Sequence, residues 1–488
     1  MSLLHLAIEQ IDFFLRNLHM RLPFRYGNAC LVATPILHTR LIARDPNGNT
    51  AQGVSGDILP PKWFDKSPAK NYRQNIEELL QVSQMGARCY LDSGAALRTP
   101  FELWHEAYRT VGRAAASAGL NGLTASFGSS IIERAVLDAA ARLAGCTFHR
   151  LVRDNLLGIG PAAIHSELSG RSVAAAVADP PLDFLNIRHT VGLADAILDA
   201  DIPAAERLDD GLPQSLEAWI KQAGIRFFKI KIAADVDTDR VRLEQIATLL
   251  NNTAPPDYGV SLDGNELFKT TGALHRWIEE VSTRPSLRDL FKHVLFIEQP
   301  MDRSITLTPE ATHSFEGFVG LPPLVIDESD DRLDAFKRAV EFGYRGTSVK
   351  NCKGIIKGLL NRMLVDFYNE QRGGGFLLTG EDLSNQPVVP LQEDLCTLSV
   401  LGIRHAERNG QHYCGTLNHL SERELRDVLK NHASLYEPFG KSARLRIRDG
   451  RLDLGSLQQV GYGVAIESDF ESMTPLADWD YSSLNLPD

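Results

Sequence analysis

The chain has 488 residues, of which 43% are hydrophobic and 23% charged, and its formal net charge is −11. This composition excludes a disordered, collagen-like or small disulfide-stapled protein. The acidic balance argues against nucleic acid or an anionic membrane surface as a partner. At about 150 residues per domain the length predicts about three domains, although a (β/α)8 barrel takes up about 250 residues as one domain.

The N-terminal residues and the cysteines bear on localisation. Residues 1–20 carry Leu4, Ile8, Ile11 and Leu15 at helical spacing and lack a basic start, so we predict an amphipathic helix rather than a signal peptide. No run of eighteen apolar residues is found, which argues against a membrane span. No two cysteines form a Cys-x-x-Cys pair, which favours a reduced, cytoplasmic setting. The cysteines are Cys30, Cys89, Cys146, Cys352, Cys396 and Cys414.

A hairpin is predicted near the start of the chain. Strand-like runs at 29–44 and 50–56 flank the segment Asp45-Pro-Asn-Gly-Asn49. The Asn-Gly pair tolerates the positive φ of a tight turn, and the proline sets the bend before it.

Helical patterns follow the hairpin at 72–90 and 99–148. The clearest helix has Ser129 or Ser130 as its predicted cap and Gly145 as its stop. Strands followed by helices indicate an α+β domain over residues 1–150.

From about residue 184 the chain alternates between short apolar runs and helical segments. The runs are FLNIRHTV, IRFFKIKIA, YGVSLDGN, HVLFIEQP, PLVIDES, RGTSVKN, GFLLTGED and, less clearly, SVLGIRHAE. Such alternation predicts a parallel sheet, and eight units in about 230 residues match a (β/α)8 barrel. The chain has no G-x-G-x-x-G at a strand-to-helix turn, which disfavours a dinucleotide-binding fold. After residue 415 the alternation stops, and we expect a hairpin and coil that return to the first domain.

Charged residues end five consecutive runs on one face of the predicted strands. Alternate residues of a strand point to opposite faces, and the active sites of such barrels form at the carboxyl ends of the strands. Singly, each charged motif is more often a strand end, a turn or a loop, so only the joint arrangement favours a functional site. The inward residues are Lys229, Lys231, Asp263, Glu298, Asp327 and Lys350.

Three of these residues are carboxylates on neighbouring strands, namely Asp263, Glu298 and Asp327. Carboxylates in one barrel mouth repel by ~4 kcal/mol per pair at about 4 Å and an effective dielectric of about 20. A divalent cation would relieve this repulsion, and a site with oxygen ligands alone selects a hard ion, most simply Mg²⁺. The predicted metal site is flanked by lysines from strand two on one side and strand six on the other.

These motifs together resemble the enolase superfamily, and within it the branch of muconate lactonizing enzyme, o-succinylbenzoate synthase and dipeptide epimerases. The matching pieces occur in order along most of the chain. They are Lys229-Ile-Lys231, Asp263-Gly-Asn265, Glu298-Gln-Pro300, Asp327-Glu-Ser329 and Lys350.

The resemblance implies an α/β protein with a modified TIM barrel, (β/α)7β, over residues 151–415. An α+β capping domain at 1–150 is expected to close the barrel and to be completed by the C-terminal segment 416–488. Mg²⁺ held by Asp263, Glu298 and Asp327 would bind the substrate carboxylate. A cation is needed there because removal of an α-proton creates an enediolate with a second negative charge.

The resemblance also implies roles for the lysines. Lys231 is expected to be a catalytic base, and Lys229 to lower the pKa of Lys231 and contact the substrate carboxylate. Lys350 is expected on the opposite face as a second acid or base, or as an electrostatic stabiliser of the enediolate. Further residues that we expect to orient the site are Asn265, Glu328 and Lys353.

Other polar residues lie near the ends of strands seven and eight. Glu381, Asp382, His405 and Glu407 either contact the substrate or belong to surface loops. Segment 22–27, Leu-Pro-Phe-Arg-Tyr-Gly, either gates the substrate or simply connects two elements. The mandelate racemase branch is disfavoured, because it would have a His on strand seven paired with an Asp on strand six.

We therefore expect an isomerase or lyase that abstracts the α-proton of a small carboxylate. Racemisation or epimerisation, cycloisomerisation or elimination would follow. A sugar-acid dehydratase of the same superfamily is an alternative, although it would prefer the His missing from strand seven. A non-catalytic relative is a second alternative, because extra segments at 47–75, 150–183 and 404–450 could block the pocket. A hydrolase is a weaker option, since strand one offers His189 but no His-x-His. The family habit also suggests a homo-oligomer.

Overall fold

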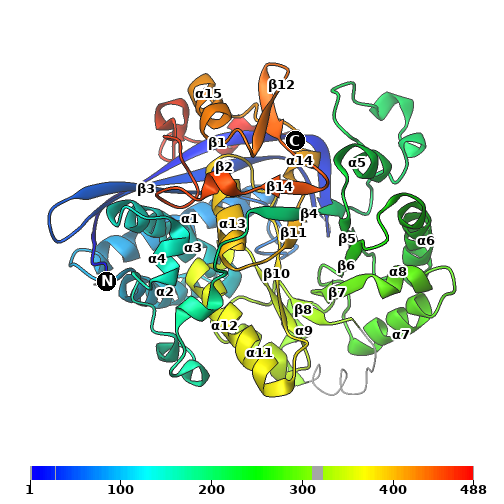
Figure 1. Ribbon diagram of the computed structural model, residues 1–488, viewed down its shortest axis with the longest axis horizontal. Helices are drawn as coiled ribbons and strands as arrows, with labels where there is room; N and C mark the ends of the chain where they lie inside the picture. The colour runs from blue at the N-terminus through cyan, green and yellow to red at the C-terminus, as the bar shows by residue number, and fades with distance from the viewer. Residues whose placement is uncertain (1–2, 28, 310–321, 487–488) are drawn as a thin grey trace.

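An antiparallel sheet with its helices lies against a closed barrel in the computed structural model, which describes residues 3–27, 29–309 and 322–486 (Figure 1). The barrel strands are short and run through the middle of the view, with the helices α5 to α8 on one outer side and α11 and α12 on another. Within the described residues, no helix is both long enough and apolar enough to cross a membrane.

The first sheet has the strand order β15-β1-β2-β3 and is antiparallel. Its members are β1 (Ala7–Tyr26), β2 (Ala29–Arg44), β3 (Thr50–Ile58) and β15 (Thr474–Pro475). The predicted hairpin turn between β2 and β3 is confirmed. Asp45 closes it, because its Oδ1 accepts hydrogen bonds from the backbone N–H groups of Asn47 and Asn49. Gly48 adopts φ +85° in this turn.

The predicted N-terminal amphipathic helix is wrong, because these residues form strand β1. The register with β2 runs from Ala7 opposite Arg44 to Tyr26 opposite Ala29, with two irregularities along the way. Ile8 and Leu15 are buried, and the irregularity between Ile8 and Gln10 keeps Ile8, Ile11 and Leu15 on one face of the strand, which accounts for their apolar spacing. Backbone pairing with a partner distant in sequence overrides the local helical period.

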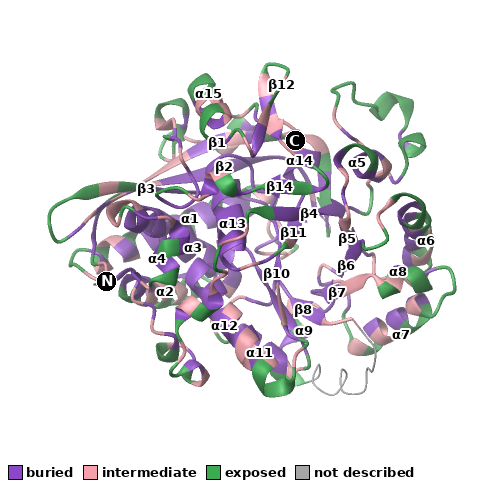
Figure 2. Cartoon of the chain, in the orientation of Figure 1, coloured by how far each residue is buried: buried purple, intermediate pink, exposed green. Residues whose placement is uncertain are grey.

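Helices of the first domain pack on one another and on β3. They are α1 (Tyr72–Ser93), α2 (Pro100–Ser117), α3 (Gly122–Leu143) and α4 (Phe148–Arg153). Helix α3 begins earlier than predicted, because Asn121 rather than Ser129 or Ser130 caps its first turn. Figure 2 shows that α3 is buried along most of its length. At Gly53, a Cβ atom would lie 1.9 Å from the carbonyl of Ala135 in α3, so glycine is required for this close approach.

Eight parallel strands among the described residues form the barrel, which closes where β11 pairs with β4. This confirms the predicted fold class. The strands are β4 (Phe184–Val191), β5 (Phe227–Lys231), β6 (Gly259–Asp263), β7 (Val294–Glu298), β8 (Leu324–Ile326), β9 (Gly346–Val349), β10 (Leu377–Gly380) and β11 (His405–Arg408). The last strand is shorter than its sequence run, because residues 399–400 still belong to helix α13.

Helices follow the strands around the outside of the barrel. They are α5 (Leu216–Ala223), α6 (Val236–Thr253), α7 (Thr271–Ser282), α8 (Arg288–Lys292), α9 (Arg303–Thr306), α11 (Ala335–Glu341), α12 (Ile355–Arg372), α13 (Val389–Val400) and the short α14 (Gly410–Tyr413). Gly373 ends α12 in the left-handed conformation, as its position in the sequence predicts.

The C-terminal residues contact both parts of the molecule. They contain α15 (Glu422–Asn431), a hairpin of β12 (Tyr436–Phe439) and β13 (Ser442–Leu445), and β14 (Arg451–Asp453). Strand β14 pairs with β4 of the barrel, whereas β15 pairs with β1 of the first sheet. The chain end thus returns to the first sheet (Figure 1). The domain boundaries near 150 and 415 stay predictions.

Candidate active site

The alternation of side chains along β5 brings two lysines into the barrel. Phe228, Ile230 and Ile232 are buried on the outer face, so Lys229 and Lys231 point inward. In the strand register, Lys231 lies beside Asp263 of β6, which in turn lies beside Glu298 of β7. These carboxyl ends meet at one rim of the barrel.

Lys229 sits in a cage of four carboxylates. Its Nζ lies 3.0 Å from Asp263 Oδ2, 2.8 Å from Glu298 Oε1, and 2.9 Å from both Glu381 Oε2 and Glu407 Oε2. The side chain is only 1% exposed. Burial by itself lowers the pKa of Lys229, but the four carboxylates outweigh it and hold the pKa well above its ordinary value.

The geometry of Lys229 differs from the role that the sequence resemblance implies. Its ammonium is enclosed by protein carboxylates, whereas we expected it to contact the substrate carboxylate. Lys231 shares one of these partners, because its Nζ lies 2.5 Å from Asp263 Oδ2. One carboxylate oxygen therefore contacts both ammonium groups, which offsets their mutual repulsion.

Arg188 of β4 is a member of this network that the sequence reasoning missed. Its guanidinium is fully buried, pairs with Glu381 and donates to Ser261 Oγ at 2.5 Å. It also lies 4.8 Å from the centre of the Phe296 ring. The strand period of two residues indicates its inward position, because Arg188 alternates with the outward Ile187 and His189. We call Arg188, Lys229, Lys231, Asp263, Glu298, Glu381 and Glu407 the Lys229 cluster.

A second group of charges surrounds Asp327 just beyond β8. Lys350 Nζ lies 2.7 Å from Asp327 Oδ2, and Lys353 Nζ lies 3.3 Å from Oδ1, which also accepts from Ser348 Oγ. Burial raises the pKa of Asp327, but Lys350 and Lys353 outweigh it and hold the pKa well below its ordinary value. Asp327, Asp330, Lys350, Lys353 and Lys357 are linked by ion pairs and form the Asp327 cluster.

The three carboxylates predicted to hold Mg²⁺ are brought to neighbouring strand ends, but ammonium groups occupy most of their oxygens. Asp263 Oδ1 accepts from a backbone N–H instead, and Glu298 Oε2 is buried and has no hydrogen-bond partner among the described residues. Burial and the nearby Asp263 and Glu381 raise the pKa of Glu298 well above its ordinary value. Among the side chains that the structure describes, no group of three or more His, Cys, Asp or Glu is arranged to hold a metal ion. Carboxylate oxygens suit a hard divalent ion, but these carboxylates are arranged around the ammonium groups of the lysines.

The Lys229 cluster and the Asp327 cluster together are called the charged centre below. The remaining predicted residues lie at varying distances from it. Asn265 has φ +42°, and its N–H donates to Asp263 Oδ1 at 2.8 Å. Glu328 is buried and pairs with Lys66 of the first domain at 3.2 Å. Asp382 pairs with Arg408 at 3.4 Å rather than with a lysine of the centre, and burial raises its pKa to about 6.

His405 does not lie at the strand tip where we placed it. It is the first residue of β11, and its ring stacks on Phe227 at 4.7 Å, at the start of β5. It therefore lies at the opposite end of the barrel from the charged centre. Glu407, two residues further along, does reach the centre through Lys229.

The charged centre is covered by apolar side chains of the first domain. The inner cavity has a volume of about 30 Å³ and reaches Lys229, Lys231, Lys350 and Glu407. Its cover is formed by Phe24, Tyr26, Leu31, Pro60 and Trp63. Lys350 Nζ lies 4.1 Å from the centre of the Trp63 ring, a cation–π contact. Segment 22–27 thus contributes to the cover through its two aromatic residues, Phe24 and Tyr26.

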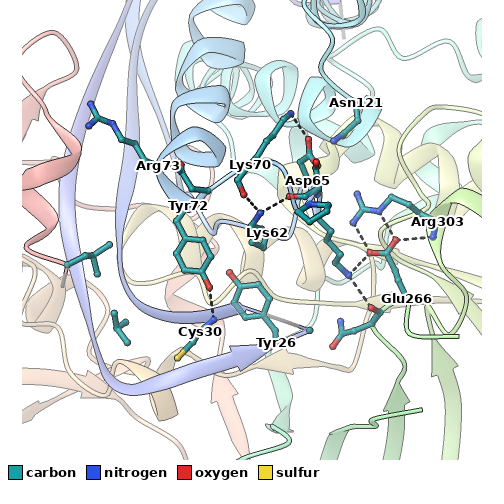
Figure 3. A pocket seen from close by; sticks show the side chains of 18 of the residues that line it. Tyr26, Cys30, Lys62, Asp65, Lys70, Tyr72, Arg73, Asn121, Glu266 and Arg303 are labelled. Carbon is teal, nitrogen blue, oxygen red and sulfur yellow. Dashed lines mark hydrogen bonds and ion pairs between the residues drawn. The ribbon is translucent and has the colours of Figure 1, made fainter. Parts of the chain in front are cut away.

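A much larger cleft, of about 1540 Å³, lies outside this cover. Figure 3 shows Tyr26 and Tyr72 on the side of the first domain, and Glu266 and Arg303 on the side of the barrel. Tyr26 and Asn265 line both the cleft and the inner cavity. They therefore mark the boundary between solvent and the charged centre.

Arg303 and Lys66 fasten the cover to the barrel. The Arg303 guanidinium donates to the carbonyls of Trp63 and Phe64, both at 2.9 Å, and pairs with Glu266 at 2.6 Å. Lys66 pairs with Glu266 and donates to the carbonyl of Asn265 at 3.1 Å. These polar contacts join residues 63–66 to the ends of β6 and β7.

Comparison with known proteins gives matches at the level of structure. No protein-family model matches the sequence, and no curated protein matches it. Among solved structures, the chain is similar to 2-chloromuconate cycloisomerase from Rhodococcus opacus 1CP, with 17% identity, coverage of 96% of this chain and 98% of that chain, and a TM-score of 0.57. Muconate lactonizing enzyme from Pseudomonas fluorescens, complexed with muconolactone, gives 17% identity, 96% and 98% coverage, and a TM-score of 0.58.

A dipeptide epimerase from Enterococcus faecalis V583, complexed with Mg and the dipeptide L-Leu-L-Tyr, gives 13% identity, coverage of 94% of this chain and 99% of that chain, and a TM-score of 0.57. Another similar structure is described as an unknown member of the enolase superfamily. At these identities the likeness is one of fold. The chain has the fold of the enolase superfamily, as the sequence resemblance predicts.

Proposed function

We propose that the protein is an enzyme that abstracts the α-proton of a small carboxylate substrate to form an enediolate. Racemisation or epimerisation, cycloisomerisation or elimination follows. The observation that carries the proposal is the placement of Lys231 and Lys350, which come from separate strands and line one inner cavity together with carboxylates. The solved structures of similar fold include a cycloisomerase and an epimerase, which agrees with this reaction class.

Mg²⁺ is the cofactor that we propose, held by Asp263, Glu298 and Asp327. When bound, it would supply positive charge to the substrate carboxylate and thereby stabilise the enediolate. Oε2 of Glu298 supports this assignment, because it has no hydrogen-bond partner among the described residues and a buried polar oxygen without a partner is costly. The similar dipeptide epimerase structure contains Mg.

The lysines of the chain carry out the proton transfer in this proposal. Lys231, 7% exposed and next to Asp263, accepts the α-proton at its Nζ. Lys350, held by Asp327 beneath Trp63, either returns a proton on the other face or stabilises the enediolate as a cation. The apolar cover excludes water from the centre, which strengthens these electrostatic interactions.

Exchange of the substrate α-proton with deuterated solvent tests the proposal. Wild type and Lys231→Met are incubated with a panel of carboxylates, with and without Mg²⁺, and deuterium uptake is followed by mass spectrometry. We expect Mg²⁺-dependent exchange in the wild type and a loss of about 10²–10⁴-fold in Lys231→Met. Lys292→Met is the matched control, because Lys292 is exposed on α8 and pairs only with the nearby Asp289 among the described residues.

Exchange that persists in Lys231→Met would remove the base assignment. A second candidate, a non-catalytic relative, is favoured by one observation, namely the inner cavity of about 30 Å³. Such a cavity holds about one water molecule, so catalysis requires the cover to move. Absence of exchange on every substrate, together with absence of Mg²⁺ binding, would support this second candidate.

A further inference from the structure

We propose that the ammonium of Lys229 competes with the divalent cation for the barrel carboxylates, so that cation binding requires Lys229 to leave part of its cage. The inference rests on the proposed function, because it concerns the same cation. It assigns to Lys229 a role as an internal counter-cation, in place of direct contact with the substrate carboxylate.

The contacts of Lys229 resemble those of a bound ion more than those of an ordinary salt bridge. Four carboxylate oxygens lie within 2.8–3.0 Å of its Nζ. An ammonium group has three N–H donors, so hydrogen bonding cannot satisfy all four oxygens at once. Attraction between one positive charge and several negative charges therefore holds the cage together. Two of these four carboxylates, Asp263 and Glu298, are the proposed cation ligands.

The charges of the Lys229 cluster match an exchange of one cation for the other. With all four carboxylates ionised, they face three cations, Arg188, Lys229 and Lys231, which leaves one negative charge in excess. Without the charge of Lys229 the excess is two, which a divalent ion neutralises. Asp327, the third proposed ligand, belongs to the neighbouring cluster, in which three lysines face two carboxylates. That cluster adds no surplus negative charge to attract the metal.

The two ions cannot use the shared oxygens equally well. Mg²⁺ requires oxygen ligands at about 2.0–2.1 Å, whereas Lys229 keeps Asp263 Oδ2 and Glu298 Oε1 at 2.8–3.0 Å. The other two carboxylates of the cage remain for Lys229 when the cation binds. Glu381 is held in place by the buried Arg188, and Glu407 accepts from Thr190 Oγ1 at 2.7 Å. Lys229 thus has a second set of partners within the cluster.

Binding of Mn²⁺ or Mg²⁺ alone, measured by isothermal titration calorimetry, tests the competition without reference to activity. We expect Lys229→Met to bind the cation at least about tenfold more tightly than the wild type, because a competing charge is gone. The cation should also raise the Tm of Lys229→Met more than that of the wild type. Lys337→Met is the control for loss of a lysine elsewhere, because Lys337 lies on α11, outside both clusters, and pairs with Glu167. Its cation affinity should equal that of the wild type.

Two further variants separate competition from a general effect of charge. Lys231→Met removes one charge beside Asp263 but leaves the cage of Lys229 intact, so its gain in affinity should be smaller than that of Lys229→Met. Lys229→Arg keeps the charge and should not bind more tightly than the wild type. If Lys229→Met folds only when the cation is added, that dependence also supports the proposal.

Equal gains in cation affinity in Lys229→Met and Lys231→Met would overturn the proposed competition. Tighter cation binding by Lys229→Arg than by the wild type would also overturn it. If the wild type binds the cation tightly and Lys229→Met binds it equally tightly, the inference is wrong and the proposed function stands. If neither the wild type nor Lys229→Met binds a cation, both the inference and the proposed cofactor are wrong.

Discussion

Gln299 illustrates how single residues shape the rim of the barrel. It follows Glu298 directly, and its backbone has φ +32°, in the left-handed region. Its side-chain Oε1 accepts from the N–H groups of Asp327 at 2.8 Å and Ser329 at 3.0 Å. Gln299 therefore fixes the position of one proposed cation ligand relative to another. The sequence motif Glu298-Gln-Pro300 contained this residue, but its role depends on the neighbouring strand.

Replacement of Gln299 should destabilise the protein through the groups that it leaves unpaired. In Gln299→Leu, the backbone N–H groups of Asp327 and Ser329 lose their buried acceptor, so we expect the free energy of unfolding to fall by about 2–4 kcal/mol. Urea unfolding at pH 7 measures the change. Gln459→Leu is the control, because the Gln459 side chain is exposed and donates to the carbonyl of Ser456. A loss no greater than that of the control would show that the two amides find other partners.

At the scale of elements, the contact between β4, α5 and α14 buries two histidines. The His189 ring of β4 lies 5.3 Å from that of His412 in α14, and Trp219 of α5 donates to His412 Nδ1 at 2.9 Å. Burial lowers the pKa of both histidines from the ordinary 6.5 to about 3. Both rings are therefore neutral in the folded protein at pH values where the unfolded chain carries charged histidines.

This difference predicts a loss of stability in acid. Between pH 6.5 and about 3 the unfolded chain binds more protons at His189 and His412 than the folded protein does, so the free energy of unfolding falls as the pH falls through this window. His189→Phe keeps the ring contact with Trp219 and removes one titrating group. Its midpoint of acid unfolding, followed by circular dichroism, should shift to lower pH, with little change in stability at pH 7.

His19→Phe is the control for this experiment, because His19 is exposed on β1 and should leave the acid midpoint unchanged. An acid midpoint in His189→Phe equal to that of the wild type would mean that other groups control acid unfolding. Two buried acids instead oppose acid unfolding. Burial raises the pKa of Asp57 and of Glu133 to about 7, so these two groups act in the opposite direction and favour the folded state as the pH falls from 7 toward 4.

For the whole molecule, the first domain decides whether the charged centre is accessible. The cover residues come from segments 24–31 and 60–63, far in sequence from the barrel strands that they close. Arg303 after β7 holds the second segment through two backbone carbonyls. The segment is thus fastened at a few polar points, and we expect those points to control its opening.

Removal of Arg303 should loosen the cover selectively. Arg303→Leu loses charge-assisted hydrogen bonds worth about 1.5–3 kcal/mol each, while Lys66 remains to pair with Glu266. We expect amide hydrogen exchange in residues 62–66 to become at least about tenfold faster, with little change in the barrel strands. Arg332→Leu is the control, because Arg332 is half-exposed and pairs with Asp334. Equal exchange in the two variants would show that apolar packing alone holds the cover.

Much of the barrel could be predicted from the sequence, because strand alternation and helix stops act locally. Each strand from β4 to β10 falls on its apolar run. The parity of IRFFKIKIA alone placed Lys229 and Lys231 inside. The same parity places Arg188 inside the barrel, between the outward Ile187 and His189 of β4. The roles of Lys231, Lys350 and the three proposed metal ligands stay predictions.

The sequence by itself determined which charged side chains reach the carboxyl ends of the strands, since a period of two residues fixes the inward face. Only the tertiary structure decided that residues 7–26 form a strand, that four carboxylates surround Lys229, and that Trp63 covers Lys350. These features depend on partners brought together when the barrel closes and the first domain docks. Such contacts are set by distances in space, which local periodicity does not encode.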